Sequence, residues 1–261
     1  MAKFKGWGVG VLLCGVLLAG CTVETPTPST AAVPSESAVA SPVPPTASAT
    51  PLPTAVPSAT LPPTPTPAAH LRLQDQFNDS QQTCFQQFNT EQAVAEVVDG
   101  HYLLTISAPA YIAQVVCESW VLSDFIYEVD IELLALPPES DFFFGVIFRV
   151  SGYEHYAVVL GSQENYCLYY AKEGAYTYLT NGTDFDVPCW VALPPIDWDA
   201  GQLHLRVVTA GTRQEVYLNG ELLAVVHDGG LQQGWFGFVA GTGPAGGLSI
   251  SYDNLVVWTE Q

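Results

Sequence analysis

The stretch FIYEVDIELLAL, residues 125–136, decides the fold class of this chain. Three carboxylates, Glu128, Asp130 and Glu132, occupy every second position in it. Successive side chains of a β-strand point to opposite faces, so this period of two predicts a strand with one acidic face and one apolar face. The apolar face needs a core to pack against, and it consists of Tyr127, Val129, Ile131 and Leu133.

Comparable short segments recur from residue 71 to residue 258, and none of them has a convincing helical pattern. They predict about thirteen strands, some of them joined by hairpin turns such as Asp99-Gly100 and Asn219-Gly220. Residues 142–150 are apolar at nearly every position except Arg149, which predicts a central strand covered on both faces. Many short strands with closely spaced turns predict an all-β fold with two packed antiparallel sheets.

Charge narrows the range of partners. The chain has 261 residues, and residues 70–261 are enough for one domain with a substantial core. This part carries 24 of the 26 Asp and Glu residues and five of the seven Lys and Arg residues, so the net charge of −19 lies within it. So acidic a surface repels nucleic acid and anionic lipid, and we therefore expect no nucleic-acid partner.

Residues 1–20 have the pattern of an export signal. Lys3 and Lys5 precede an apolar run, residues 8–18, that is too short to span a bilayer as a mature anchor. The run ends in Leu18-Ala19-Gly20-Cys21, which resembles the lipobox of bacterial lipoproteins. The resemblance implies cleavage before Cys21 and lipid attachment to its thiol, so that acyl chains hold the exported protein at the bacterial cell membrane.

A low-complexity tether, residues 21–69, follows the signal. Its residues 22–69 contain 13 of the 20 prolines and no aromatic residue, and Thr, Ser, Ala and Val make up most of the rest. Such a segment has too little apolar bulk for a core, so we expect a disordered, extended stalk. At about 3.1 Å per residue, its reach is at most about 150 Å, enough to hold the domain clear of the membrane.

Four cysteines remain in the domain: Cys84, Cys117, Cys167 and Cys189. Export places them in an oxidising compartment, where disulfides are the default. Three pairings are formally allowed. We favour Cys84–Cys117 and Cys167–Cys189 because each closes a local loop, over a metal site, for which no CxxC spacing is present.

The C-terminal half of the domain carries a family resemblance. The runs LHLRVVTAGTRQEVYLNGELLAVVHD (203–228), GWFGFVAG (234–241) and LSISYDNLVVW (248–258) resemble concanavalin-A-like jelly rolls. Laminin-G-like modules and the 3-keto-disaccharide hydrolase domain family share this pattern, and the earlier strands fit the same template. The resemblance implies a two-sheet antiparallel jelly-roll sandwich, a fold that hosts lectins, hydrolases and scaffolds alike.

The acidic strand is a candidate catalytic site. Glu128-Val129-Asp130-Ile131-Glu132 is similar to the E-x-D-x-E strand of family 16 glycoside hydrolases. The resemblance implies that Glu128 is the nucleophile, that Asp130 orients it and that Glu132 is the acid/base. The motif comes early in the domain and lacks a flanking Trp-rich platform, and a solvated strand face of an acidic protein has the same pattern.

A sugar-binding face is the second candidate, because sugars stack on aromatic rings. Residues 153–198 are rich in Tyr and Trp, and Arg149 is the one charge on its apolar strand. The alternative is that Arg149 pairs with an acid and that the tyrosines form cross-strand pairs. The candidate ligand contacts are Arg149, Tyr156, Tyr169, Trp190 and Trp198.

A structural calcium ion is the third candidate. Asp253 lies in the last predicted strand and Asp75 in the first, and these strands are often neighbours in such sandwiches. Calcium prefers oxygen ligands, which carboxylates supply. A turn stabilised by Asp and Asn side chains is the alternative, and no other cofactor is expected.

The sequence therefore favours a surface lipoprotein that displays a lectin-like module for glycan or cell-envelope polysaccharide, without catalysis. A glycoside hydrolase or related sugar-processing enzyme that uses Glu128, Asp130 and Glu132 is the first alternative. An envelope interaction module that binds no sugar is the second.

Overall fold

The protein is described from a computed structural model, which covers residues 70–138, 141–181, 189–195 and 201–259. The predicted signal, the predicted lipidation site Cys21, the predicted tether and Trp198 lie outside the described residues. Within these ranges every regular element is a β-strand, and sixteen strands form two antiparallel sheets. The predicted all-β, two-sheet class is therefore confirmed.

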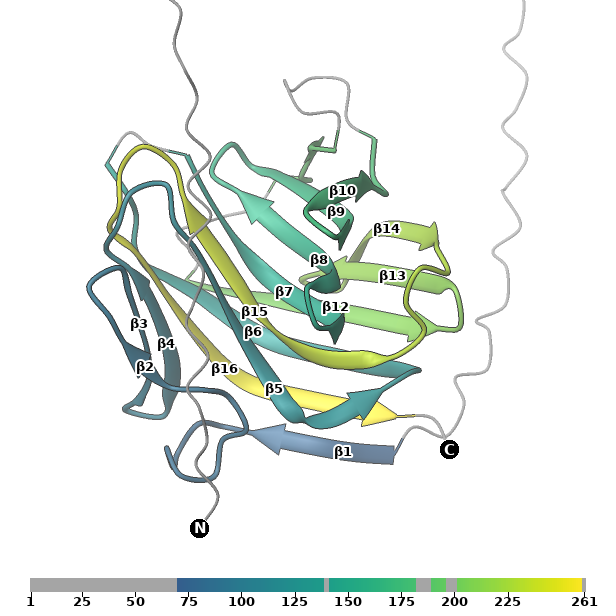
Figure 1. Cartoon of the computed structure of the whole chain (residues 1–261), viewed down its shortest axis with the longest axis horizontal. Helices are drawn as coiled ribbons and strands as arrows, with labels where there is room; N and C mark the ends of the chain where they lie inside the picture. The colour runs from purple at the N-terminus through teal and green to yellow at the C-terminus, as the bar shows by residue number, and fades with distance from the viewer. Residues whose placement is uncertain (1–69, 139–140, 182–188, 196–200, 260–261) are drawn as a thin grey trace, which may run out of the picture. The chain divides into compact units, whose positions relative to one another are not determined.

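The larger sheet, sheet A, has nine strands and contains the acidic strand near its middle. In pairing order it consists of β14 (Glu221–His227), β13 (Arg213–Leu218), β12 (Gln202–Ala210), β6 (Phe125–Ala135), β16 (Leu248–Thr259), β4 (His101–Ile106), β3 (Ala93–Val98) and β2 (Phe88–Asn89), with β1 (His70–Asp75) also paired to β16. Figure 1 shows β1 and β16, from the two ends of the domain, running side by side.

The second sheet, sheet B, has seven strands. In pairing order it consists of β10 (Ala175–Tyr178), β9 (Asn165–Lys172), β8 (Glu154–Gly161), β7 (Phe142–Ser151), β15 (Gly234–Thr242) and β5 (Ile112–Leu122), with the short β11 (Val191–Ala192) paired to β9. The chain passes from sheet B to sheet A between β5 and β6, and returns between β6 and β7 (Figure 1). The two sheets therefore belong to one sandwich.

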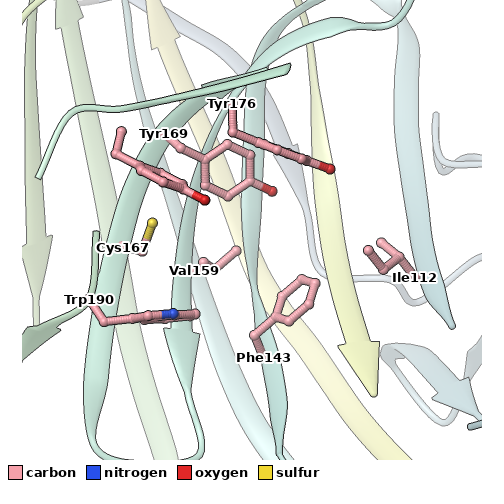
Figure 2. A pocket seen from close by; sticks show the side chains of 8 residues that line it. Ile112, Phe143, Val159, Cys167, Tyr169, Tyr176 and Trp190 are labelled. Carbon is pink, nitrogen blue, oxygen red and sulfur yellow. The ribbon is translucent and has the colours of Figure 1, made fainter. Parts of the chain in front are cut away.

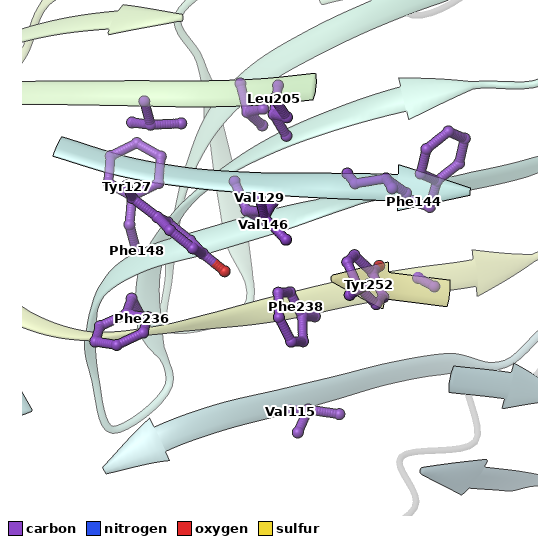
Figure 3. Packing of buried hydrophobic residues seen from close by; sticks show 14 of the residues in the cluster. Val115, Tyr127, Val129, Phe144, Val146, Phe148, Leu205, Phe236, Phe238 and Tyr252 are labelled. Atoms are coloured by element: carbon purple, nitrogen blue, oxygen red, sulfur yellow. The ribbon is translucent and has the colours of Figure 1, made fainter. Parts of the chain in front are cut away.

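The core lies between the sheets, where alternate residues of both sheets interdigitate (Figure 3). Phe238 of β15 stacks on Tyr252 of β16, with ring centroids 4.0 Å apart. Tyr127 of β6 meets Phe236 of β15 edge to face at 5.3 Å. Each such side chain contributes roughly 1.5–3 kcal/mol when it leaves water completely, so the apolar face of the acidic strand is fixed by the core.

β5 is one continuous strand of 11 residues although it contains the polar residues Glu118 and Ser119. The pairing of β5 with β15 shifts between Gly234 and Phe236, so a bulge absorbs the extra polar residues and the strand continues. The short β11 adds to β9 on the side of Tyr166 and Asn165.

Both predicted disulfides are present. Cys84 pairs with Cys117, with Cα atoms 5.0 Å apart, and Cys167 pairs with Cys189, with Cα atoms 5.2 Å apart. The two bonds indicate an oxidising, extracytoplasmic environment. Among the residues that the structure describes, no helical segment has the length and hydropathy needed to cross a membrane.

Candidate functional site

An aromatic cleft lies on the outer face of sheet B, the face turned away from the core between the sheets (Figure 2). Its volume is about 220 Å³. Side chains from five strands and one loop line it. They are Ile112, Phe143, Val159, Cys167, Tyr169, Tyr176, Tyr178 and Trp190.

Strand pairing explains how these side chains gather. The hairpins from β7 to β10 place alternate residues of each strand on the outer face. Val159 lies opposite Cys167 in the β8–β9 pair, and Tyr169 lies opposite Tyr178 in the β9–β10 pair. The outer face of β7 is also apolar, and it joins a second cluster of buried residues that is separate from the main core. The prediction that β7 is central and covered on both faces is therefore confirmed.

Trp190 comes from a loop, and its neighbours fix it on both sides. Before it, Cys189 is bonded to Cys167 of β9. The hydroxyl of Thr180 also donates a hydrogen bond to the carbonyl of Cys189 (2.8 Å). After it, Val191 of β11 pairs with Tyr166 of β9. Residues 189–193, the strap, therefore hold the indole against sheet B.

A glycine makes room for this ring. A Cβ atom at Gly161 of β8 would lie 2.2 Å from Oδ1 of Asn165, and it would lie 3.1 Å from Cζ3 and 3.3 Å from Cη2 of Trp190. Such contacts are tighter than ordinary van der Waals packing. Gly161 therefore lets the indole lie close to the sheet.

The tyrosines of the cleft contact one another. The rings of Tyr169 and Tyr176 meet edge to face at 5.3 Å. Burial, and then the neighbouring phenols of Tyr176 and Tyr178, raise the pKa of Tyr169. Its phenol therefore stays protonated near neutral pH and can donate a hydrogen bond. Tyr176 and Tyr178 remain 55% and 41% exposed, so their rings are accessible to a ligand.

A histidine and an amide lie beside the cleft. Nε2 of Gln114 is 3.3 Å from Nε2 of His155, and the His155 ring contacts Tyr169 edge to face at 6.2 Å. Burial lowers the pKa of His155, which favours its neutral form. None of the described residues that line the cleft carries a charge. The cleft can therefore stack and hydrogen-bond a neutral ligand, but its described lining offers no carboxylate or amine for acid/base chemistry.

The three carboxylates of the acidic strand lie elsewhere. Tyr127, Val129 and Ile131 enter the core, so Glu128, Asp130 and Glu132 lie on the outer face of sheet A. The cleft is on the outer face of sheet B. The sandwich therefore separates the carboxylates from the aromatic rings.

A polar network occupies this acidic face. Oε1 of Glu128 is 3.3 Å from Nε of Arg206. Asp130 lies 2.7 Å from Nδ1 of His204 and accepts a hydrogen bond from the Asn254 amide (2.9 Å). These contacts match the solvated strand face that was the alternative to catalysis, and the catalytic roles of the three carboxylates stay a prediction.

Two of the predicted ligand contacts are wrong because they are buried. Arg149 has no exposed surface, and its guanidinium donates to the carbonyls of Ser123 (2.9 and 3.1 Å) and Leu231 (3.0 Å). It also pairs with Asp124 at 3.3 Å, as the alternative proposed. Tyr156 lies in the core, and its phenol donates to a carboxylate oxygen of Asp228.

Two other predicted contacts, Tyr169 and Trp190, line the cleft, although their binding role stays a prediction. Sequence reasoning missed Ile112, Phe143 and Val159. The apolar run of β7 was visible, but the sequence did not show which of its faces points outward. Tyr176 and Tyr178 belong to the aromatic segment noted in the sequence.

The predicted calcium ligands have other partners. Asp75 accepts a hydrogen bond from the backbone N–H of Phe77 (2.8 Å). Asp253 accepts one from the N–H of Asn254 (2.6 Å) and lies 3.9 Å from the ring of His101. The described residues include no cluster of three or more His, Cys, Asp or Glu side chains arranged to hold a metal ion. Calcium binding through Asp75 and Asp253 stays a prediction.

No protein-family model matches this sequence, and no curated protein is detectably similar to it. Solved structures do share its fold. A Bacillus subtilis protein of unknown function with a galectin-like fold is 11% identical, with a TM-score of 0.55, and the match covers 75% of this chain and 99% of that one.

Two glucanases are also similar in fold. A Bacillus licheniformis β-glucanase is 12% identical with a TM-score of 0.52, and the match covers 72% of this chain and 98% of the glucanase. A β-1,3-1,4-glucanase from a mouse hindgut metagenome is 12% identical with a TM-score of 0.53, over 72% of this chain and 99% of that enzyme. Likenesses at such low identity concern the fold, and they confirm a galectin- or concanavalin-like jelly-roll sandwich.

Proposed function

We propose that this protein is a non-catalytic glycan-binding module, displayed at the bacterial cell surface by a lipid anchor on Cys21. The observation that carries the proposal is the uncharged aromatic cleft on the outer face of sheet B. Tyr and Trp side chains offer apolar ring faces to the C–H groups of a sugar and polar tips to its hydroxyls.

The arrangement of the cleft favours binding over hydrolysis. A retaining glycosidase needs two carboxyl groups about 5–5.5 Å apart on either side of the scissile bond. The acidic strand offers Glu128 and Glu132, but their Cα atoms are about 13 Å apart on a flat strand. A sugar in the cleft is also separated from them by both sheets. Sugar binding and the acidic strand therefore do not form one active site.

The cleft is preorganised, which also supports glycan binding. The strap is fixed to β9 by a disulfide on one side of Trp190 and by strand pairing on the other. A binding site whose rings are already ordered loses less entropy when the ligand arrives. The named glucanases among the solved structures of similar fold indicate that polysaccharide sites are built on this architecture.

A polysaccharide-binding assay tests the proposal. The purified full chain is run in native gels that contain soluble polysaccharides and is incubated with insoluble ones, including cell-wall preparations. Retention by at least one polysaccharide is expected, and Tyr176→Ala or Trp190→Ala should weaken it at least tenfold, a change of about 1.4 kcal/mol. Tyr153→Ala is the matched control, because Tyr153 is 88% exposed and does not line the cleft.

Two results would count against the proposal. Binding to no polysaccharide would remove the glycan function and favour an envelope interaction module. Binding that survives in both cleft variants would place the sugar site elsewhere.

The anchor is tested separately. Labelling of growing cells with radioactive palmitate should mark the protein, and Cys21→Ser should abolish the label. A label that persists in Cys21→Ser would contradict lipidation at this residue.

A further inference from the structure

The cleft has aromatic side chains on two opposite sides. Figure 2 shows Tyr169 and Tyr176 on one side, Trp190 and Phe143 on the other, and Val159 between them. The first side is built by β9 and β10, and the second by β7 and the strap. A six-membered ring that enters between the two sides therefore has aromatic side chains on both sides of it.

We propose that the cleft seats one uncharged pyranose whose ring hydroxyls are all equatorial, such as a β-linked glucose, xylose or N-acetylglucosamine residue. The inference rests on the proposed glycan-binding function and names the class of sugar. In such a ring the axial substituents on both faces are hydrogen atoms, so both faces are apolar. The hydroxyls point outward around the rim, toward water and the tyrosine phenols.

An axial hydroxyl would make one face of the sugar ring polar. A mannose residue has one at C2, and a galactose residue has one at C4. On either face it would be pressed against an aromatic side chain and would lose hydrogen bonds to water without replacement. The expected discrimination is about tenfold or more in affinity.

The charge and the volume of the cleft also favour a single uncharged sugar ring. The described lining residues are uncharged and the chain has a net charge of −19, so sulfated, phosphorylated or uronic acid polymers would be repelled. The volume of about 220 Å³ is smaller than a site for a drug-sized ligand, typically roughly 300–1,000 Å³. One sugar ring fits this size better than an extended oligosaccharide.

The test compares four soluble tetrasaccharides that share a β-1,4 linkage and differ in the sugar. Isothermal titration calorimetry with the full chain measures the affinity for the tetraoses of glucose, xylose, mannose and galactose. The glucose and xylose forms should bind at least tenfold more tightly than the other two. Tyr176→Ala should weaken their binding at least tenfold, and Tyr153→Ala should leave it unchanged.

The outcomes separate the two proposals. Equal or tighter binding of the mannose or galactose form overturns the inference about sugar class and leaves the glycan-binding function standing. The inference about sugar class is also overturned if neither these tetraoses nor the β-1,4-linked tetraose of N-acetylglucosamine binds while the polysaccharide assay finds a ligand that depends on Trp190. If that assay finds no ligand either, both proposals fail.

Discussion

The outer faces of the two sheets differ in chemistry although both sheets enclose the same core. On sheet A, β6 and β12 place Glu128, Asp130, His204 and Arg206 outward, and these side chains pair with one another. On sheet B, most of the corresponding positions of β7, β8 and β9 are apolar, and they include Ile147, Val159 and Tyr169. A sandwich needs only one apolar face per sheet, so the apolar outer face of sheet B is available for ligand binding.

The comparison also shows why alternating acids are weak grounds for an active site. Exposed ion pairs contribute about 0–1 kcal/mol each, and such a network suits any solvated strand surface. Exposed aromatic side chains are different, because each one leaves apolar surface in water until a ligand covers it. The cleft on sheet B, which has no charged residue in its described lining, is therefore the stronger candidate for a binding site.

Removing a disulfide should give the largest loss of stability. Comparing the two disulfides should also show which of them glycan binding depends on. Replacing Cys167 and Cys189 together with Ser should lower the free energy of unfolding by about 3 kcal/mol, because the cross-link no longer restricts the unfolded chain. It should also weaken glycan binding, since the strap no longer holds Trp190. Urea unfolding and titration calorimetry measure the two effects.

The other disulfide is the matched control. Replacing Cys84 and Cys117 with Ser should cost a similar amount of stability, because the separation is 33 residues compared with 22. Glycan affinity should be kept, since neither residue lines the cleft. Equal loss of affinity in both folded variants would contradict the role of the strap.

Arg149→Met should give the next largest loss of stability. The substitution removes the hydrogen bonds of the guanidinium to the carbonyls of Ser123 and Leu231 and its ion pair with Asp124, and a hydrogen bond to a charged group contributes about 1.5–3 kcal/mol. We expect the free energy of unfolding to fall by about 2–4 kcal/mol in urea. Arg72→Met is the control, because Arg72 is exposed and lies 3.8 Å above the ring of Trp120, a contact worth about 0.5–1 kcal/mol. Similar losses in the two variants would show that the buried contacts of Arg149 contribute no more to stability than an exposed cation–π contact.

His155 should make the stability of the sheet B face depend on pH. Burial lowers the pKa of His155 in the folded protein below the unfolded value of about 6.5. As the pH falls through about 6.5, the unfolded chain binds the proton first, so stability present above that pH is lost on acidification. The melting temperature should therefore fall less between pH 7.5 and pH 5.0 in His155→Gln than in the wild type. Equal falls would mean that His155 does not contribute.

Glu128→Gln should have the smallest effect. The ion pair with Arg206 is partly exposed, so its loss should change the free energy of unfolding by no more than about 1 kcal/mol. Glycan affinity at the cleft should be unchanged. The same variant tests catalysis: if the wild type hydrolyses a polysaccharide and Glu128→Gln does not, the acidic face is an active site after all.

Much of the fold was available from the sequence. The period of two in residues 125–136 fixed which side of β6 enters the core, because only one of its faces is apolar. The hairpin turns Asp99-Gly100 and Asn219-Gly220 join β3 to β4 and β13 to β14 as expected. The short separations within each cysteine pair also led to the correct disulfides.

The candidate site could be predicted only in part. Tyr169 and Trp190 were found from the density of aromatic residues, but Tyr156, chosen by the same argument, is buried. Arg149, chosen as the one charge on its apolar strand, is buried as well. Arg149 sits at an irregular position of β7, with φ of 50°, where the pairing with β8 shifts. That local irregularity lets its guanidinium reach the turn between the sheets, and no pattern in the sequence marks it.

The sequence by itself determined the all-β class, the direction of the amphipathic strands, the cysteine pairs and the acidic charge of the domain. The tertiary structure alone decided which aromatic residues share a surface. Alternation assigns a face only where the two faces differ in polarity, and both faces of β7 are apolar. Pairing between strands distant in the sequence then brought Phe143, Tyr176 and Trp190 to one cleft and placed Glu128 on the opposite side of the sandwich.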